Sequence, residues 1–292
     1  MWATLIQRRK TLPMIALLTE PFGYDYMTTA MLVAAMVGGL CAFLSAYLML
    51  KGWSLIGDAL SHAVVPGVAG AYMLGLPFAL GAFISGGLAA LAMLFLTERT
   101  GLKTDVIIGM IFTSFFGLGL FMISINPIAI SLETIIMGNI LAITPEDTRQ
   151  LLWIGGVSLA VLLMRWKDLM VVFFDEHHAR SIDLNPGLLK FMFFTLLSVA
   201  VVAAMQTVGA FLVIAMVVTP GATAYLLADR FGWVLTLSFA IGVTTGFLGA
   251  YLSYFIDGAT GGVIVCLQTL VFVLAFFLAP KHGRLAARGG EG

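Results

Sequence analysis

The sequence consists largely of long apolar runs, separated by short segments that carry nearly all of its charges. A membrane-spanning helix needs about 20 consecutive, mostly apolar residues. Nine runs are candidate spans, at residues 27–50, 55–74, 78–96, 105–123, 151–166, 188–204, 208–227, 233–254 and 262–278. The apolar piece at 128–143 is shorter and bounded by prolines, which is typical of a re-entrant or interfacial segment. The sequence therefore predicts an all-α, polytopic membrane protein with about nine (eight to ten) transmembrane helices.

The exterior of this chain has to face lipid, because charged residues are too few to coat a water-soluble surface. They make up 10% of the 292 residues, against 61% hydrophobic residues, whereas a soluble domain has roughly 25% charged residues. The formal net charge of zero gives no indication of a nucleic-acid partner. Cys41 and Cys266 each lie in an apolar run and are expected to be packing residues.

The lysines and arginines predict the orientation, since cytoplasmic loops of membrane proteins carry an excess of them. With nine spans, one side holds Lys51, Arg99, Lys103, Arg165, Lys167, Arg180, Lys190, Arg230, Lys281, Arg284 and Arg288. Arg8, Arg9 and Lys10 fall on the other side and are discordant. We expect an N-terminal interfacial segment (1–26), a transmembrane domain (27–280) with a cytoplasmic loop at 167–187, and a cytoplasmic C-terminal tail (281–292).

Asp58 and His62 are ionisable residues inside an apolar run. On a helix, positions i and i+4 lie on one face, one turn apart. A carboxylate within the bilayer costs about 2.5–3.5 kcal/mol on insertion scales, so such residues usually line a pathway. Oxygen and nitrogen ligands suit manganese, iron or zinc ions. The spacing fits a metal site, and it equally fits a hydrogen-bonded pair that holds helices together.

Two proline–glycine pairs, Pro66-Gly67 and Pro220-Gly221, interrupt apolar runs. Proline removes a backbone donor, and irregular backbone at membrane depth is typical of cavity walls. Each pair predicts a helix break, which either acts as a gate or is an ordinary kink. The G-x-x-x-G at 242–246 predicts a close contact between helices.

The longest polar interruption, residues 167–186, predicts a short amphipathic helix. Asp175 is its candidate N-cap, two or three helical turns follow, and Pro186 is expected to end it. Such a helix at the cytoplasmic face suits docking to a soluble partner. His177 and His178 are adjacent, so they point to different sides of a helix and are poorly placed to share a metal ion.

Motifs for nucleotide binding and hydrolysis are absent from the sequence. It contains no G-x-x-x-x-G-K-[ST], no H-E-x-x-H and no G-x-S-x-G. We therefore do not expect this chain to bind ATP through a phosphate loop or to act as one of these hydrolases.

Three stretches together resemble one family: SLIGDALSHAVVPG at 54–67, FDEHHAR at 174–180 and GAFLVIAMVVTPGATA at 209–224. They are similar to the membrane permease subunits of bacterial ABC importers for manganese, iron or zinc, and the spans look closer to the manganese and iron permeases. The resemblance covers about residues 20–280. Gly221 departs from the family, in which alanine is usual there.

The resemblance implies a fold similar to that of the vitamin B12 and metal-chelate importers, in the bacterial cytoplasmic (inner) membrane. Two permeases, identical or related, would surround a translocation path, with a cytoplasmic ATP-binding subunit below and a periplasmic or surface metal-binding protein above. This chain would be a transport subunit, not an enzyme. Asp58 and His62 would contact the passing Mn²⁺, Fe²⁺ or Zn²⁺ as cargo, and no cofactor is implied. The ATPase-coupling residues would be Asp175, Glu176, His177, Ala179, Arg180 and Leu184.

Two other classes of protein remain open at this point. An ATPase-independent secondary transporter or channel tends to carry several intramembrane carboxylates, whereas Asp58 stands alone. A membrane-embedded metalloenzyme would need a third ligand to complete its centre. Co-purification with a separate ATPase would distinguish the importer from both.

Overall fold

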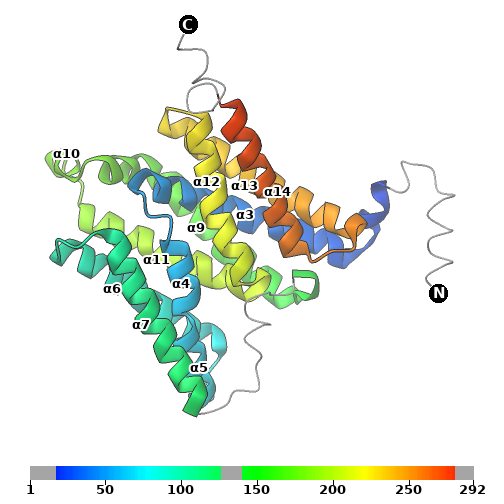
Figure 1. The fold of residues 1–292 in the computed structure, drawn as a ribbon, viewed down its shortest axis with the longest axis horizontal. Helices are drawn as coiled ribbons and strands as arrows, with labels where there is room; N and C mark the ends of the chain where they lie inside the picture. The colour runs from blue at the N-terminus through cyan, green and yellow to red at the C-terminus, as the bar shows by residue number, and fades with distance from the viewer. Residues whose placement is uncertain (1–17, 126–139, 280–292) are drawn as a thin grey trace, which may run out of the picture.

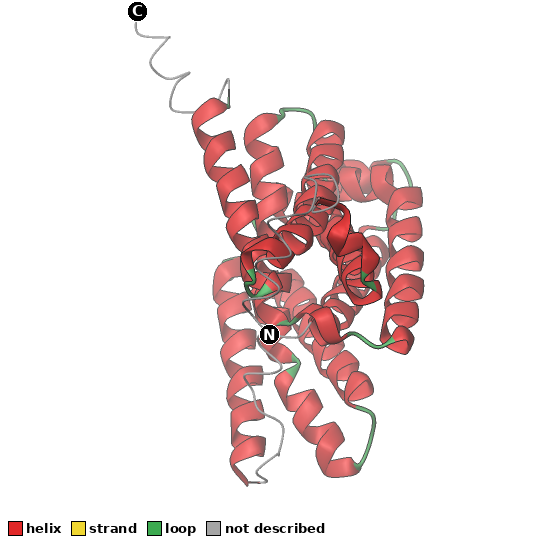
Figure 2. Cartoon of the chain, turned by 90° about the vertical axis from the view of Figure 1, so that its right-hand side faces the viewer, coloured by secondary structure: helices red, strands yellow, loops and turns green. Residues whose placement is uncertain are grey.

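The computed structural model describes residues 18–125 and 140–279, and these residues are almost entirely helical (Figure 1). The elements are η1 (Glu20–Gly23), α3 (Asp25–Lys51), α4 (Ile56–Ala63), α5 (Val65–Leu74), α6 (Phe78–Arg99), α7 (Thr104–Ile125), η2 (Ile140–Ala142), α9 (Pro145–Phe174), α10 (Glu176–Ser181), α11 (Pro186–Val208), α12 (Ala210–Leu227), α13 (Phe231–Ile256) and α14 (Thr260–Leu278). Short loops join the helices, and the described residues contain no strand (Figure 2). The predicted all-α membrane fold is confirmed.

Within residues 18–125 and 140–279, seven helices are long and apolar enough to cross a membrane: α3, α6, α7, α11, α12, α13 and α14. The other two expected spans differ from the prediction. Residues 55–74 form two short helices, α4 and α5, instead of one. The span expected at 151–166 is part of the much longer α9, in which charged residues flank the apolar stretch on both sides. Most of the expected segment at 128–143, and the chain before residue 18, lie outside the described residues.

Helix α9 extends beyond its predicted bounds for local reasons. Thr144 caps its first turn by accepting a hydrogen bond from the backbone N–H of Asp147 at 3.1 Å, and Pro145 occupies the first helical position. At the other end the helix continues to Phe174. The first part of the expected loop at 167–187 is therefore helical, and the connection to the next long helix begins at Asp175.

Helix α3 is the centre of the bundle and packs against α12 and α13 (Figure 1). Its side chains are buried around most of its circumference. The contact with α13 depends on small residues: a Cβ added to Gly38 would collide with the carbonyl oxygen of Gly242, and one added to Gly246 with that of Ala34. The close contact predicted from the G-x-x-x-G at 242–246 is confirmed.

Helix α12 continues through Pro220, so the predicted break at Pro220-Gly221 is a proline inside an unbroken helix. Ser45 of α3 supplies partners there: its hydroxyl accepts a hydrogen bond from the N–H of Gly221 at 3.1 Å and donates to the carbonyl of Val218 at 3.2 Å. A Cβ on Gly221 would collide with the Ser45 hydroxyl. The glycine at this position therefore leaves the room that the Ser45 hydroxyl occupies.

The chain does break near Pro66-Gly67, but at Val64: α4 ends at Ala63 and α5 begins at Val65, with Pro66 and Gly67 in the first turn of α5. The Ser85 hydroxyl of α6 donates a hydrogen bond to the carbonyl of Ala63 at 2.6 Å. Next to it, Gly67 and Gly81 bring α5 and α6 into backbone contact, because a Cβ on either would collide with the carbonyl oxygen of the other. The residues around the break are therefore fixed against α6.

We predict that Gly67→Ala lowers the stability of the folded protein in detergent by about 1–3 kcal/mol, the usual cost of overpacking a core. The matched control is Gly70→Ala on the same helix, where the added Cβ would meet only the end of the Met122 side chain at 3.4 Å. Thermal denaturation followed by circular dichroism measures both variants. Equal melting temperatures for the two would show that the α5–α6 contact is looser than the structure has it.

Candidate functional site

Asp58 and His62 lie one turn apart on α4, as their spacing predicts. The Nδ1 atom of His62 is 3.2 Å from the Oδ1 atom of Asp58 and 3.1 Å from the Asp58 carbonyl oxygen. Both contacts are within one helix, so the pair does not hold two helices together. Asp58 is in the first turn of α4, where the positive end of the helix dipole favours a carboxylate.

Helix α7 positions the imidazole of His62 through two aromatic rings. Phe112 and Phe116 each meet the His62 ring nearly edge to face, with centroid separations of 5.2 and 5.4 Å. The two phenylalanines stack on each other and limit the orientations open to the imidazole. Sequence analysis missed them, because two phenylalanines four residues apart in an apolar helix are ordinary packing residues without a further signal.

The Asp58–His62 pair opens to the outside of the chain. The side chains of Asp58 and His62 are 41% and 25% exposed. Among the described residues, no group of three or more His, Cys, Asp or Glu side chains could hold a metal ion. One chain thus offers one carboxylate and one imidazole, an incomplete shell that suits transient contact with an oxygen- and nitrogen-seeking cation.

Asp175 is the N-cap of α10, which confirms the prediction. Its carboxylate accepts hydrogen bonds from the backbone N–H groups of His177 at 2.8 Å and His178 at 3.1 Å. Bonds from the N–H groups of His178 and His177 lower the pKa of the Asp175 carboxyl from its ordinary value. The cap therefore remains ionised throughout the physiological range.

Helix α10 is shorter than predicted, because it ends at Ser181 and not at Pro186. Asp183 takes a left-handed conformation (φ 59°) that turns the chain away from the helix axis. Pro186 is the first residue of the next helix, α11, with Asn185 as its N-cap. Proline suits that position, since the first helical N–H has no partner within the helix.

One face of α10 is buried and the rest projects from the bundle. Ala179 is fully buried, and its carbonyl accepts a hydrogen bond from the N–H of Leu184 at 3.0 Å. His177, His178 and Arg180 are exposed. The helix therefore presents a polar surface while Ala179 and the following turn attach it to the protein.

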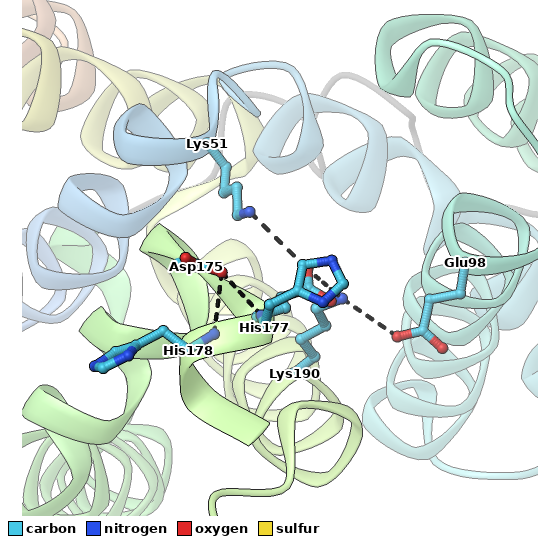
Figure 3. A network of polar contacts seen from close by, with 7 residues as sticks. Lys51, Glu98, Asp175, His177, His178 and Lys190 are labelled. Carbon is cyan, nitrogen blue, oxygen red and sulfur yellow. Dashed lines mark hydrogen bonds and ion pairs between the residues drawn. The ribbon is translucent and has the colours of Figure 1, made fainter. Parts of the chain in front are cut away.

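Four charged residues form a network at the start of α10, and Figure 3 shows Lys51, Lys190 and Glu98 around its first turn. The Nζ atom of Lys190 is 2.8 Å from Glu176 and 3.4 Å from Glu98, and Lys51 is 4.0 Å from Glu176. A hollow of about 520 Å³ adjoins it, lined by Glu98, Glu176, Arg180, Asp183 and residues 184–187. Sequence analysis missed the network, because Glu98 and Lys190 are 92 positions apart and no local pattern links them.

The fold and the site define a class: a helical membrane permease, with an Asp–His pair exposed on one helix and a capped polar helix projecting from one end. Comparison with known families gives the identification. The chain belongs to the ABC 3 transport family, whose profile matches residues 23–279.

Its relatives include metal transport proteins. The chain is 63% identical, over 94% of both chains, to the chelated iron transport system membrane protein YfeC of Yersinia pestis. It is 47% identical to the manganese transport system membrane protein MntB of Synechocystis, over 92% of this chain and 88% of the relative.

Two solved structures share the fold. PsaBC from Streptococcus pneumoniae, in complex with Fab, matches with a TM-score of 0.81 and 34% identity, over 94% of this chain and all of that one. A metal-chelate type ABC transporter in an inward-facing conformation matches with a TM-score of 0.67 and 17% identity, over 91% and 90% of the two chains. The second likeness concerns the fold alone and confirms that the fold is similar to that of a metal-chelate type ABC transporter.

We predict that Asp175→Ala speeds hydrogen exchange at the amides of His177 and His178 by roughly two- to thirty-fold, the range that loss of an N-cap produces. Asp175→Asn keeps an acceptor at the same place and should exchange like the wild type. The lowered pKa means that the cap is present above the ordinary Asp value of about 3.9 and is lost only as the pH falls through the folded value. The ratio of the exchange rates of Asp175→Ala and Asp175→Asn at these two amides should therefore be constant between about pH 5 and pH 8.

Proposed function

We propose that this chain is the membrane-spanning permease of an ABC importer that carries manganese or iron ions into the cytoplasm, with zinc as a further possible cargo. The observation that carries the proposal is the Asp58–His62 pair: one oxygen and one nitrogen ligand on a half-exposed helix face. The names of the iron and manganese relatives, at 63% and 47% identity, support the same cargo.

The exposure of Asp58 favours a path shared with a second permease, either another copy or a related chain. A carboxylate on the outer surface of a membrane protein cannot face hydrocarbon without a large penalty, so such residues face a cavity or another chain. A second permease would cover this face and contribute a second Asp–His pair. Four ligands would then meet the ion, which is enough for capture and weak enough for release.

In this proposal α10 is the docking element for a separate ATP-binding subunit, on which ATP hydrolysis takes place. The exposed His177, His178 and Arg180 would contact that subunit, and the hollow beside Glu176 gives its side chains a recess. Asp175, Ala179 and Leu184 would hold α10 in shape.

The orientation of the chain in the bacterial cytoplasmic membrane is inferred from the charges at the end of the molecule where α10 lies. The ion pairs of Glu176 gather Lys51 and Lys190 beside α10, and a cluster of lysines is typical of the cytoplasmic side. The C-terminus would also be cytoplasmic, and an external metal-binding protein would deliver the ion at the opposite end.

The mechanism of transport follows from these positions. ATP binding closes the two ATPase subunits, which displaces the docked α10 helices. The two permeases tilt, the path opens toward the binding protein, and the ion reaches the Asp58–His62 pairs. Hydrolysis and product release reverse the tilt, and the weakly held ion leaves toward the cytoplasm.

We predict that Asp58→Asn lowers uptake of radioactive manganese by at least about tenfold, since even residues that only orient metal ligands contribute 10–100-fold. Cells depleted of other importers are suitable, with uptake normalised to the protein present in the membrane. The matched control is Asp105→Asn, an exposed carboxylate in the first turn of α7, which should transport normally. Parallel uptake of iron and zinc measures the cargo preference.

A second variant, with residues 175–184 deleted, tests the coupling to ATP. It should reach the membrane and take up no manganese. Uptake that persists without these residues would favour an ATPase-independent transporter. Equal uptake by Asp58→Asn and Asp105→Asn would remove Asp58 from the ion path.

A further inference from the structure

Lys190 is the only charged residue that is buried in the described part of the chain, with 7% of its surface exposed. A buried ammonium is unfavourable unless carboxylates or other acceptors surround it. Lys190 meets this condition through two carboxylates from different elements. Glu176 is the first residue of α10, and Glu98 lies in the last turn of α6. A single ammonium therefore joins α10, α6 and its own helix, α11.

Helix α6 continues from this junction to the helix that carries the candidate metal ligands. The Ser85 hydroxyl of α6 donates to the carbonyl of Ala63, the residue next to His62, and Gly81 makes backbone contact with Gly67 just beyond the break. Ser85 and Glu98 are thirteen residues apart on one helix, a separation of about 20 Å. An α-helix of this length moves as a stiff rod, so a displacement at Glu98 also displaces the contacts beside His62.

We propose that Lys190 is a positioning residue, which links the movement of α10 to α6 and so to the α4–α5 junction beside His62. The inference rests on the proposed function, because it assumes that α10 moves with an ATPase subunit. Without the Lys190 link, α10 remains attached to α9 and to the turn at Leu184, so the ATPase still docks. What is lost is the transfer of its movement to α6, and ATP is then hydrolysed with little transport.

The chain offers a matched control in Lys51. This lysine also faces Glu176, but at 4.0 Å, with 26% of its side chain exposed, and it lies on α3, whereas Lys190 lies on α11. Lys51→Gln removes a positive charge from the same carboxylate and leaves the link to α6 intact. A change that depended only on charge beside α10 would affect the Lys51 and Lys190 variants alike.

The test uses the chain assembled with its ATPase and binding protein in proteoliposomes, and measures Mn²⁺ taken up per ATP hydrolysed. Glu98→Gln is the principal variant, because its side chain is 45% exposed and its replacement leaves Lys190 paired with Glu176. We expect Glu98→Gln and Lys190→Met to lower this ratio by at least about five-fold, the lower range of coupling between distant sites. Lys51→Gln should keep the wild-type ratio, and Lys190→Arg, which retains the charge, should keep more of it than Lys190→Met.

The ratio separates coupling from simple stabilisation. If Lys190 only stabilises the fold, Glu98→Gln and Lys190→Met lower the yield of assembled complex, but the complexes that do assemble take up as much Mn²⁺ per ATP hydrolysed as the wild type. That result would overturn the inference. If Lys190→Met does not assemble, Glu98→Gln decides the question alone. A wild-type complex that hydrolyses ATP without taking up Mn²⁺, Fe²⁺ or Zn²⁺ would overturn the proposed function and this inference together. Wild-type uptake with an unchanged ratio in Glu98→Gln would overturn the inference alone.

Discussion

The absence of water from the membrane interior is the constraint on which this structure depends, because backbone polar groups there must find partners within the protein. Long helices satisfy the requirement except where a proline removes a donor. At Pro220 and Pro66 the chain places a serine from a neighbouring helix, Ser45 or Ser85, against the backbone beside the proline. These serines also attach one helix to another. The hydrogen bonds that give the backbone its partners therefore also hold α12 against α3 and α4 against α6.

Serine hydroxyls can reach a neighbouring backbone only if the helices lie very close together, and glycine makes this possible. Gly221 leaves room for the Ser45 hydroxyl, and the Gly67–Gly81 contact lies beside the Ser85 bond. Lipid is as apolar as leucine, so association of these helices relies on close packing and on interhelical hydrogen bonds. The 32 glycines of the sequence are consistent with this mode of assembly.

Local sequence patterns predicted the features that depend on neighbours in the chain. Run length and composition located the long helices, and the position of Asp175 before a polar stretch identified its cap. The predicted end of α10 at Pro186 was wrong. A proline after a polar stretch can either follow the end of one helix or be the first residue of the next, and with Asn185 as N-cap Pro186 is the first residue of α11. The run at 55–74 is two short helices, α4 and α5; its proline indicated a break, whereas hydropathy alone registers a single apolar run. The contacts of Lys190 and of Phe112 join distant segments, and only the packed structure brings them together.

The two charged sites differ in a way that fits their proposed tasks. At Lys190 the ammonium is buried and in contact with two carboxylates, so leaving it without both partners would carry a large penalty, and the three helices tend to move together. At Asp58 the carboxylate is 41% exposed and pairs with the imidazole one turn away, so an arriving cation can replace that contact at small cost. A transporter needs both properties, a rigid link where force is applied and a weak site where the ion passes. The different burial of Lys190 and Asp58 supplies them within one chain.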